Sequence, residues 1–183
     1  MAKIYVFLAD GCEEVEAMTP VDILRRAGHT VCTVSITGKE IVTGANGIRL
    51  AADELLENTD GKDGDVFLLP GGMPGTLHLG QCEVLTSMLK EKYQEGRRIA
   101  AICAAPTVLG ELGFLQGRKT VCYPGMEDKL TGADVQNVPT VSDGNITTAK
   151  GVGAAIDFGL ELVRLLDGQD KALEIKEQIV YAG

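Results

Sequence analysis

Cys103 is the residue whose surroundings in this chain most favour chemistry. It lies in "AAICAAP" (100–106), between an apolar run that predicts a strand over 97–102 and a segment that predicts a helix over 104–113. A thiol at such a junction faces free backbone N–H groups and the positive end of the helix dipole, so we expect a lowered pKa and a nucleophilic thiolate. Core packing is the alternative role, because free cysteine is among the most buried residue types.

Small residues surround Cys103 and indicate a sharp strand-to-helix turn, since backbone packs on backbone there. This is the logic of the nucleophile elbow in G-x-S-x-G hydrolases, with alanine in place of glycine. The other cysteines do not combine a strand-helix junction with surroundings that favour a thiolate, and their number and spacing suggest neither a disulfide framework nor a zinc cluster. We therefore expect the other four of the five cysteines to be core or surface residues without a chemical role: Cys12, Cys32, Cys82 and Cys122.

Three glutamates in "GCEEVEA" (11–17) follow the first predicted strand. Glu13 and Glu14 suit an exposed first helical turn, where carboxylates interact favourably with the helix dipole. Glu16 has apolar residues four and seven positions later, so a carboxyl buried on that face would have a raised pKa and could donate a hydrogen bond to a thiolate. A third solvated glutamate is the alternative.

A glycine loop, "LLPGGMPG" (68–75), follows another buried strand. Gly71 and Gly72 would expose backbone N–H groups at the same sheet edge, where they could bind an anion or a developing oxyanion. A plain turn is the alternative. The two histidines, His29 and His78, are both expected to be solvated turn residues, so a papain-like Cys–His pair is not favoured.

Strands and helices alternate through most of the chain, which predicts an open, doubly wound α/β sandwich forming one domain over 1–183. Besides the strand before Cys103, strands are predicted at 3–9, 30–36, 64–72 and 119–124. The segment 40–53 predicts a hairpin or a strand with a Gly-rich turn, and 138–150 predicts two strands around a turn. The other helices are predicted at 13–28, 83–96, 154–168 and 169–178. Thr19 and Pro20 resemble an N-cap and a first helical residue, so the first helix is expected to kink or restart there.

Composition and short motifs exclude several classes of function. Acidic residues outnumber basic ones by 26 to 17, for a net charge of −9, which argues against nucleic acid or an anionic membrane surface as a partner. The chain has no secretory signal pattern and no apolar run of roughly 18 residues, so a cytoplasmic protein is expected. A P-loop lysine, a dinucleotide fingerprint and a metal-ligand spacing are all missing, so no cofactor or metal is expected.

Four segments in this order resemble the ThiJ/PfpI superfamily along nearly the whole chain. The nearest likeness is to the branch of the Parkinsonism-associated protein deglycase and its bacterial relatives. The most specific of the four is the elbow around Cys103. The segments are "ADGCEEVEAMTPVDILRRAG", "DVFLLPGG", "AAICAAPTVLGELG" and "AKGVGAAIDFGLELVRLLDG". The resemblance implies a flavodoxin-like sandwich and a homodimer with the cysteine near the interface.

The resemblance also implies roles for individual residues. Cys103 matches the reactive cysteine, and Glu16 matches the protonated glutamate that hydrogen-bonds it. Gly71 and Gly72 match the loop whose N–H groups face the cysteine, and Ala104 follows the nucleophile at the helix start.

Two positions depart from the family pattern. Many members carry a histidine where this chain has Tyr123, which leaves Tyr123 to shape the pocket. Some relatives carry an arginine where this chain has Asn46, and Arg49 is out of register with that position. The missing histidine disfavours a PfpI-like peptidase.

Two functions follow from the resemblance. In the first, the Cys103 thiolate attacks a small dicarbonyl such as methylglyoxal, Glu16 moves a proton, and the N–H groups of Gly72 and Ala104 steady the oxyanion. A hydroxy acid is released, as in cofactor-independent glyoxalases, and the same chemistry on glycated amino groups would be deglycase activity. In the second, Cys103 is oxidised to a sulfinate and the protein is a redox sensor or a stress chaperone.

Overall fold

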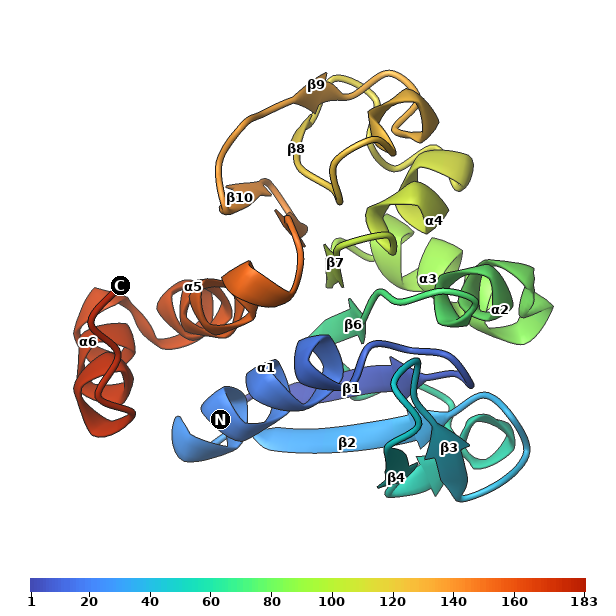
Figure 1. The fold of residues 1–183 in the computed structure, drawn as a ribbon, viewed down its shortest axis with the longest axis horizontal. Helices are drawn as coiled ribbons and strands as arrows, with labels where there is room; N and C mark the ends of the chain where they lie inside the picture. The colour runs from blue at the N-terminus through green and yellow to red at the C-terminus, as the bar shows by residue number, and fades with distance from the viewer.

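The centre of the molecule is a seven-stranded sheet with the order β10–β11–β7–β6–β1–β2–β5, in a computed structural model that describes residues 1–183 (Figure 1). All neighbouring strands run parallel except the antiparallel pair of β10 and β11. The strands of this sheet are β1 (Lys3–Leu8), β2 (Thr30–Ser35), β5 (Glu54–Leu55), β6 (Val66–Leu69), β7 (Arg98–Ile102), β10 (Thr140–Asp143) and β11 (Ile146–Ala149).

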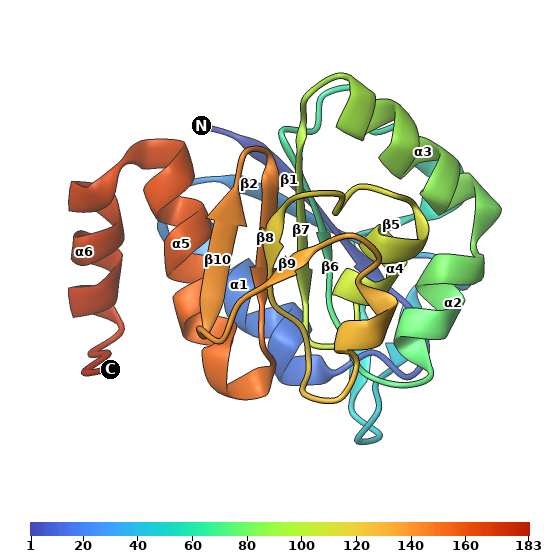
Figure 2. The same cartoon turned by 90° about the horizontal axis from the view of Figure 1, so that it is seen from above.

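Helices cover both faces of the sheet. The helices are α1 (Glu14–Arg26), α2 (Gly75–Gln81), α3 (Glu83–Gln94), α4 (Pro106–Glu111), α5 (Ala155–Asp167) and α6 (Gln169–Gln178). One face carries α1 and α5, with α6 packed outside α5, and the other carries α2, α3 and α4 (Figures 1 and 2). This arrangement confirms the predicted doubly wound, flavodoxin-like sandwich.

Burial on both faces explains the continuous apolar runs of the central strands. In β1, Ile4 and Val6 face the core under α1 and α5, whereas Tyr5 and Phe7 face the core under α3. All four side chains are buried, because a parallel sheet is covered by helices on both sides.

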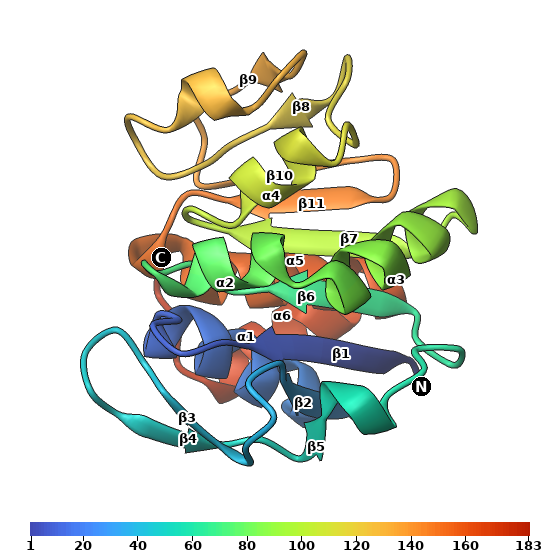
Figure 3. The same cartoon turned by 90° about the vertical axis from the view of Figure 1, so that its right-hand side faces the viewer.

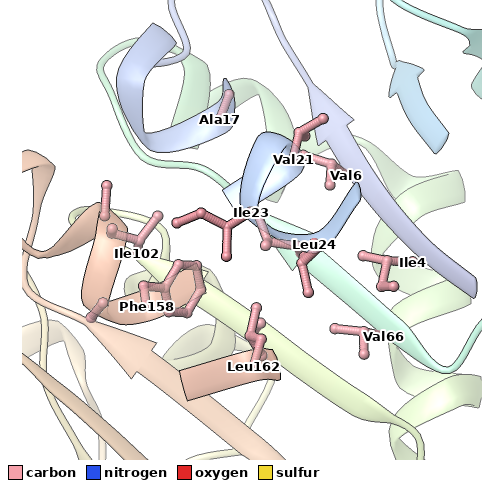
Figure 4. Packing of buried hydrophobic residues seen from close by; sticks show 14 of the residues in the cluster. Ile4, Val6, Ala17, Val21, Ile23, Leu24, Val66, Ile102, Phe158 and Leu162 are labelled. Carbon is pink, nitrogen blue, oxygen red and sulfur yellow. The ribbon is translucent and has the colours of Figure 1, made fainter. Parts of the chain in front are cut away.

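Helices α1 and α5 approach each other closely. Ile23 of α1 lies beside Phe158 and Leu162 of α5 (Figure 4). A Cβ atom built on Gly159 would lie 2.8 Å from Ile23 Cδ1, so a larger residue at position 159 would force Ile23 to shift. The contact fixes α1, and therefore Glu16, against the sheet.

The predicted restart of the first helix at Thr19 is wrong. The helix α1 runs without interruption through Pro20, and its N-cap is Glu13, not Thr19. Ala17, Val21 and Leu24 flank Pro20 and are all buried in one core cluster, and this packing outweighs the loss of one backbone hydrogen bond.

Two local predictions also need correction. The segment 119–124 forms only a short strand, β8 (Lys119–Thr120), which pairs with β9 (Asp134–Val135) outside the main sheet. The next residues hydrogen-bond elsewhere, for example from the Val121 N–H to Thr148 Oγ1 at 2.9 Å. The helix α2, directly after the glycine loop, was not predicted because its seven residues include two glycines.

The hairpin predicted in 40–53 is confirmed as β3 (Ile41–Thr43) paired with β4 (Arg49–Ala51). It projects from the body of the molecule at the sheet edge where the parallel strands end (Figure 3). The helices α1 and α4 also begin at this edge, so the residues singled out from the sequence gather there.

Candidate active site

Cys103 lies on a strained turn between β7 and α4. Its backbone has a φ of 64°, in the left-handed region that non-glycine residues rarely adopt. Its N–H donates to the Ala149 carbonyl at 2.9 Å, and its carbonyl accepts the Tyr123 N–H at 2.7 Å. These hydrogen bonds hold a conformation that costs roughly 1–3 kcal/mol, and such strain is typical of a presented nucleophile. The side chain remains 9 % exposed.

Glu16 is fully buried in the first turn of α1, directly beside Cys103. Its backbone N–H donates to the Glu13 side chain at 2.7 Å, and the Glu13 N–H donates to the Gly71 carbonyl at 2.9 Å. The Glu16 carboxyl lies against the Cys103 side chain, while its Oε2 accepts the Gly71 N–H at 3.1 Å. The predicted pair of cysteine and buried glutamate is therefore assembled by the helix cap and the glycine loop together.

Gly71 separates the two side chains and leaves no room for a larger residue. A Cβ atom on Gly71 would lie 2.6 Å from Cys103 Cβ, 2.6 Å from Glu16 Oε2 and 2.8 Å from the Ile102 carbonyl. The first glycine of the loop is thus required by close approach, which lets the thiol and the carboxyl meet.

The protonation of Glu16 is controlled by burial. Burial raises the pKa of Glu16 to about 7, although hydrogen bonds with Cys103 and the N–H groups of Gly71 and Val152 act in the opposite direction. Glu16 Oε1 is buried without a hydrogen-bond partner of good geometry. An orphaned oxygen is more costly on a carboxylate than on a neutral acid, so the geometry favours the protonated form.

The sequence predicted a lowered pKa for Cys103. This prediction is wrong while Glu16 is ionised. Burial and the negative charge on Glu16 raise the pKa of Cys103 to about 12, and the N–H groups of Gly72 and Ala104 lower it only in part. Protonating Glu16 removes the repulsion and supplies a hydrogen-bond donor. The two groups therefore titrate as a pair, and a thiolate forms at neutral pH only while Glu16 keeps its proton.

Two backbone donors face the sulfur of Cys103. The N–H groups of Gly72 and Ala104 point at it, and neither donates to a backbone carbonyl. The N–H of Gly71 is different, because it is used by Glu16. The pair of free N–H groups has the arrangement of an oxyanion hole.

Tyr123 and the turn after β11 form the outer wall of the site. Tyr123 is 52 % exposed. A Cβ atom on Gly151 would lie 3.6 Å from Tyr123 Cδ2 and 3.8 Å from Glu16 Oε1. Contacts of Ala149 and Val152 with the site were not predicted from the sequence, although the glycines around Val152 indicate a turn.

Glu14 is buried, contrary to the exposed position expected from the sequence. Its carboxylate accepts hydrogen bonds from the Asn46 backbone at 2.8 Å, from Asn46 Nδ2 at 2.9 Å and from the Ile48 backbone at 3.2 Å. Burial raises the pKa of Glu14, but these hydrogen bonds outweigh burial and lower it overall. Glu14 therefore ties the β3–β4 hairpin to α1 beside the Cys103–Glu16 pair.

The histidines lie away from Cys103. His29 is buried, not solvated as predicted: its Nδ1 accepts the Ala2 N–H at 3.2 Å, and its Nε2 lies 3.0 Å from Asp167. His78 is exposed on α2, with Nδ1 2.8 Å from the Asp10 carbonyl. Neither can act as a base for Cys103.

The remaining chemistry-bearing groups form no second centre. Cys12, Cys32 and Cys122 are buried, Cys82 is partly buried, and all five cysteines are free. The structure brings no three potential metal ligands together. None of its helices is long and apolar enough to span a membrane.

Comparison with known proteins matches residues 2–165 to the DJ-1/PfpI family. The chain belongs to this family. It is 37 % identical over 185 residues to the Parkinson disease protein 7 homolog of Danio rerio, covering 97 % of this chain and 96 % of that protein. It is 33 % identical over 175 residues to the glutathione-independent glyoxalase DJR-1.2 of Caenorhabditis elegans, covering 94 % of this chain and 92 % of that protein.

Two further relatives are a longer protein and a protein of known structure. The Protein DJ-1 homolog B of Arabidopsis thaliana is 37 % identical over 97 % of this chain, but the chain spans only 41 % of that protein. The solved structure of oxidized DJ-1 from Toxoplasma gondii matches over 100 % of both chains, with a TM-score of 0.96 and 36 % identity. The family and its fold are thus established for this chain.

Proposed function

We propose that this protein is a cysteine-dependent, cofactor-free enzyme that converts reactive dicarbonyls into hydroxy acids. The observation that carries the proposal is the buried carboxyl of Glu16 against the Cys103 thiol, opposite two free backbone N–H groups. This combination supplies a nucleophile, a proton carrier and an oxyanion hole within one small site. The relative named a glutathione-independent glyoxalase supports the same reaction type.

The first step forms a hemithioacetal. The Cys103 sulfur attacks the aldehyde carbon of a 2-oxo aldehyde, and the carbonyl π bond breaks toward oxygen. The N–H groups of Gly72 and Ala104 stabilise the oxyanion, which then takes the proton from Glu16.

The second step moves hydrogen within the substrate. The Glu16 carboxylate removes the proton from the former aldehyde carbon, and a proton returns to the neighbouring carbon, so that the aldehyde is oxidised while the ketone is reduced. The resulting thioester is hydrolysed by water, which releases the hydroxy acid and restores the thiol. No external oxidant or reductant is consumed. Attack of the sulfur on the carbon that joins a dicarbonyl to an amino group, with cleavage of the C–N bond and release of the protonated amine, would constitute deglycase activity.

Methylglyoxal turnover tests this proposal. We expect the purified protein, without added thiol, to form many equivalents of lactate, and Cys103→Ser to form none. A Cys103→Ser variant with substantial activity would overturn the mechanism, as would a parent protein that forms at most one equivalent.

Redox sensing is the second candidate function. The same N–H groups and the protonated Glu16 would hold a Cys103 sulfinate, and one solved relative is described as oxidized. A sensor uses its thiol once, whereas an enzyme recovers it. Selective oxidation of Cys103 by peroxide without lactate formation would favour this candidate, including a stress-chaperone role.

A homodimer is proposed on the face beside the site. Val15, Ile48 and Val152 are exposed apolar residues there. Glu14 bonds the Ile48 N–H and the Glu16 carboxyl faces the Val152 N–H, so the three lie around one end of α1. Val15→Asp should reduce the molar mass measured by light scattering if this face pairs. We also propose a cytoplasmic location, because five free cysteines suit a reducing compartment.

A further inference from the structure

A cavity of about 630 Å³ opens beside the catalytic pair, and the reaction steps above do not use its charged lining. Its wall includes Gly151, which lies close to Glu16 Oε1, and Tyr123, which lies close to Gly151. Two polar side chains, Lys150 and Asn137, also line it. Cys103 itself does not line the cavity, but Gly151 joins its wall to the Cys103–Glu16 pair, so the remote end of a substrate could extend into it.

Lys150 and Cys103 directly follow two neighbouring strands, β11 and β7. In the register of β11 and β7, Ala149 pairs with Ile102, and the Cys103 N–H donates to the Ala149 carbonyl at 2.9 Å. Lys150 and Cys103 are the next residues on these two strands. The backbone of Lys150 is thus adjacent to that of Cys103, and the Lys150 side chain lines the cavity beside the pair.

The donors of Lys150 and Asn137 form no ion pair, although Glu127 lines a neighbouring cavity together with these two residues. Lys150 makes no ion pair, and its one side-chain hydrogen bond runs from Nζ to Asn137 Oδ1 at 2.6 Å. That bond orients the Asn137 amide, whose Nδ2 has no partner. The ammonium and the amide present adjacent N–H donors, which match the two oxygens of a carboxylate.

One acidic residue lines the same cavity. Asp157, in the first turn of α5, faces the Tyr181 hydroxyl rather than Lys150. Its negative charge weakens the attraction of the cavity for anions. Substituting Asp157 therefore offers a second way to change that attraction.

We propose that Lys150 and Asn137 form an anion subsite, and that the preferred substrates are 2-oxo aldehydes carrying a carboxylate at the end remote from the aldehyde. The substrate class rests on the proposed dicarbonyl activity, whereas the subsite itself does not. In a protein of net charge −9, a preference for anions at Cys103 requires a local cation.

Alkylation of Cys103 tests the subsite without any turnover. Iodoacetate and iodoacetamide are nearly the same size, and both react when the thiolate sulfur displaces iodide, but only iodoacetate is anionic. The ratio of their rates at Cys103, measured by mass spectrometry of the labelled peptide, cancels differences in thiol pKa. We expect Lys150→Gln to lower this ratio about tenfold and Lys150→Arg to retain it.

Two further variants complete the alkylation test. Lys90→Gln removes one positive charge from exposed α3 and should leave the ratio unchanged, whereas Asp157→Asn should raise it. A ratio that Lys150→Gln does not alter, or that Lys90→Gln lowers equally, would overturn the subsite.

Turnover then tests the substrate class. We expect 4,5-dioxopentanoate to have a higher kcat/KM than the uncharged 2-oxopentanal, and Lys150→Gln to lower the first value about tenfold with the second within twofold. Equal effects on both compounds would overturn the substrate class. If neither compound nor methylglyoxal is turned over, the proposed enzyme function fails, and the alkylation ratio alone decides the subsite.

Discussion

Gly71 and Cys103 approach so closely that a single methyl group would not fit between them: a Cβ atom on Gly71 would lie 2.6 Å from Cys103 Cβ. The same atom would lie 2.6 Å from Glu16 Oε2, so both Cys103 and Glu16 would have to move. The glycine loop thus sets the spacing of the pair as well as supplying N–H groups.

Gly71→Ala should therefore reduce dicarbonyl turnover by about 100-fold, because displacing reacting groups by even 1 Å has an effect of that size. Steady-state lactate formation measures it. Gly80→Ala is the matched control, since its nearest neighbour, Val108 Cγ2, is 3.4 Å away and the site is helical. Near-normal activity in Gly71→Ala would contradict the close-approach argument.

The rate of Cys103 alkylation should rise with pH through a step near 7 and then stay level for several pH units. The pair loses its first proton near 7 and its second near 12, following the pKa values of Glu16 and Cys103. The reactive thiolate belongs to the singly protonated pair. Iodoacetamide labelling across pH measures this profile.

Glu16→Gln provides the contrast for that profile, because it removes the partner that titrates near 7. The step should disappear in the variant. A parent protein whose labelling rate climbs steadily to high pH, without a step, would show that the two groups do not share a proton.

Ionisation of Glu16 should also destabilise the fold. The folded-state pKa of about 7 is above the ordinary value of 4.5, so the folded protein holds a proton that the unfolded chain releases. This contribution is complete below pH 4.5 and is lost as the pH rises through 7. Relative to Glu16→Gln, the parent should lose on the order of 3 kcal/mol of unfolding free energy between acidic and neutral pH. Denaturant unfolding measures these free energies. If they changed with pH equally in the parent and in Glu16→Gln, that result would contradict a buried, neutral Glu16.

Glu14→Ala should free the β3–β4 hairpin from α1. The substitution removes the acceptor for two backbone N–H groups, those of Asn46 and Ile48, and leaves a cavity. The fold should lose about 2–3 kcal/mol, because the lost bonds involve a charged acceptor. Hydrogen exchange should accelerate at these two amides and not at Val34 in the neighbouring sheet strand. Unchanged hydrogen exchange at the Asn46 amide would show that Glu14 does not hold the hairpin against α1.

Gly159→Ala should destabilise the contact between α1 and α5. The new methyl would lie 2.8 Å from Ile23 Cδ1, and overpacking of this kind costs about 1–3 kcal/mol. Thermal unfolding measures the loss. Combining it with Ile23→Val should recover part of the stability, and a double variant no more stable than Gly159→Ala would place the strain elsewhere.

The sequence alone determined the local features of this protein. Runs of large apolar residues identified the central strands, because a sheet buried on both faces needs them. Small residues around Cys103 identified the elbow, since a sharp strand-to-helix turn excludes bulk. The motifs were also sufficient to indicate the DJ-1/PfpI family.

Tertiary structure decided the properties that depend on burial and on partners distant in the chain. Glu16 and Gly71 are 55 residues apart, yet their hydrogen bond places the carboxyl on the thiol. Glu14 and His29 resemble solvated residues locally but are buried by segments that fold over them. The pKa of Cys103 was misjudged for the same reason: desolvation and a neighbouring charge outweigh the helix start, and both arise only when the chain is packed.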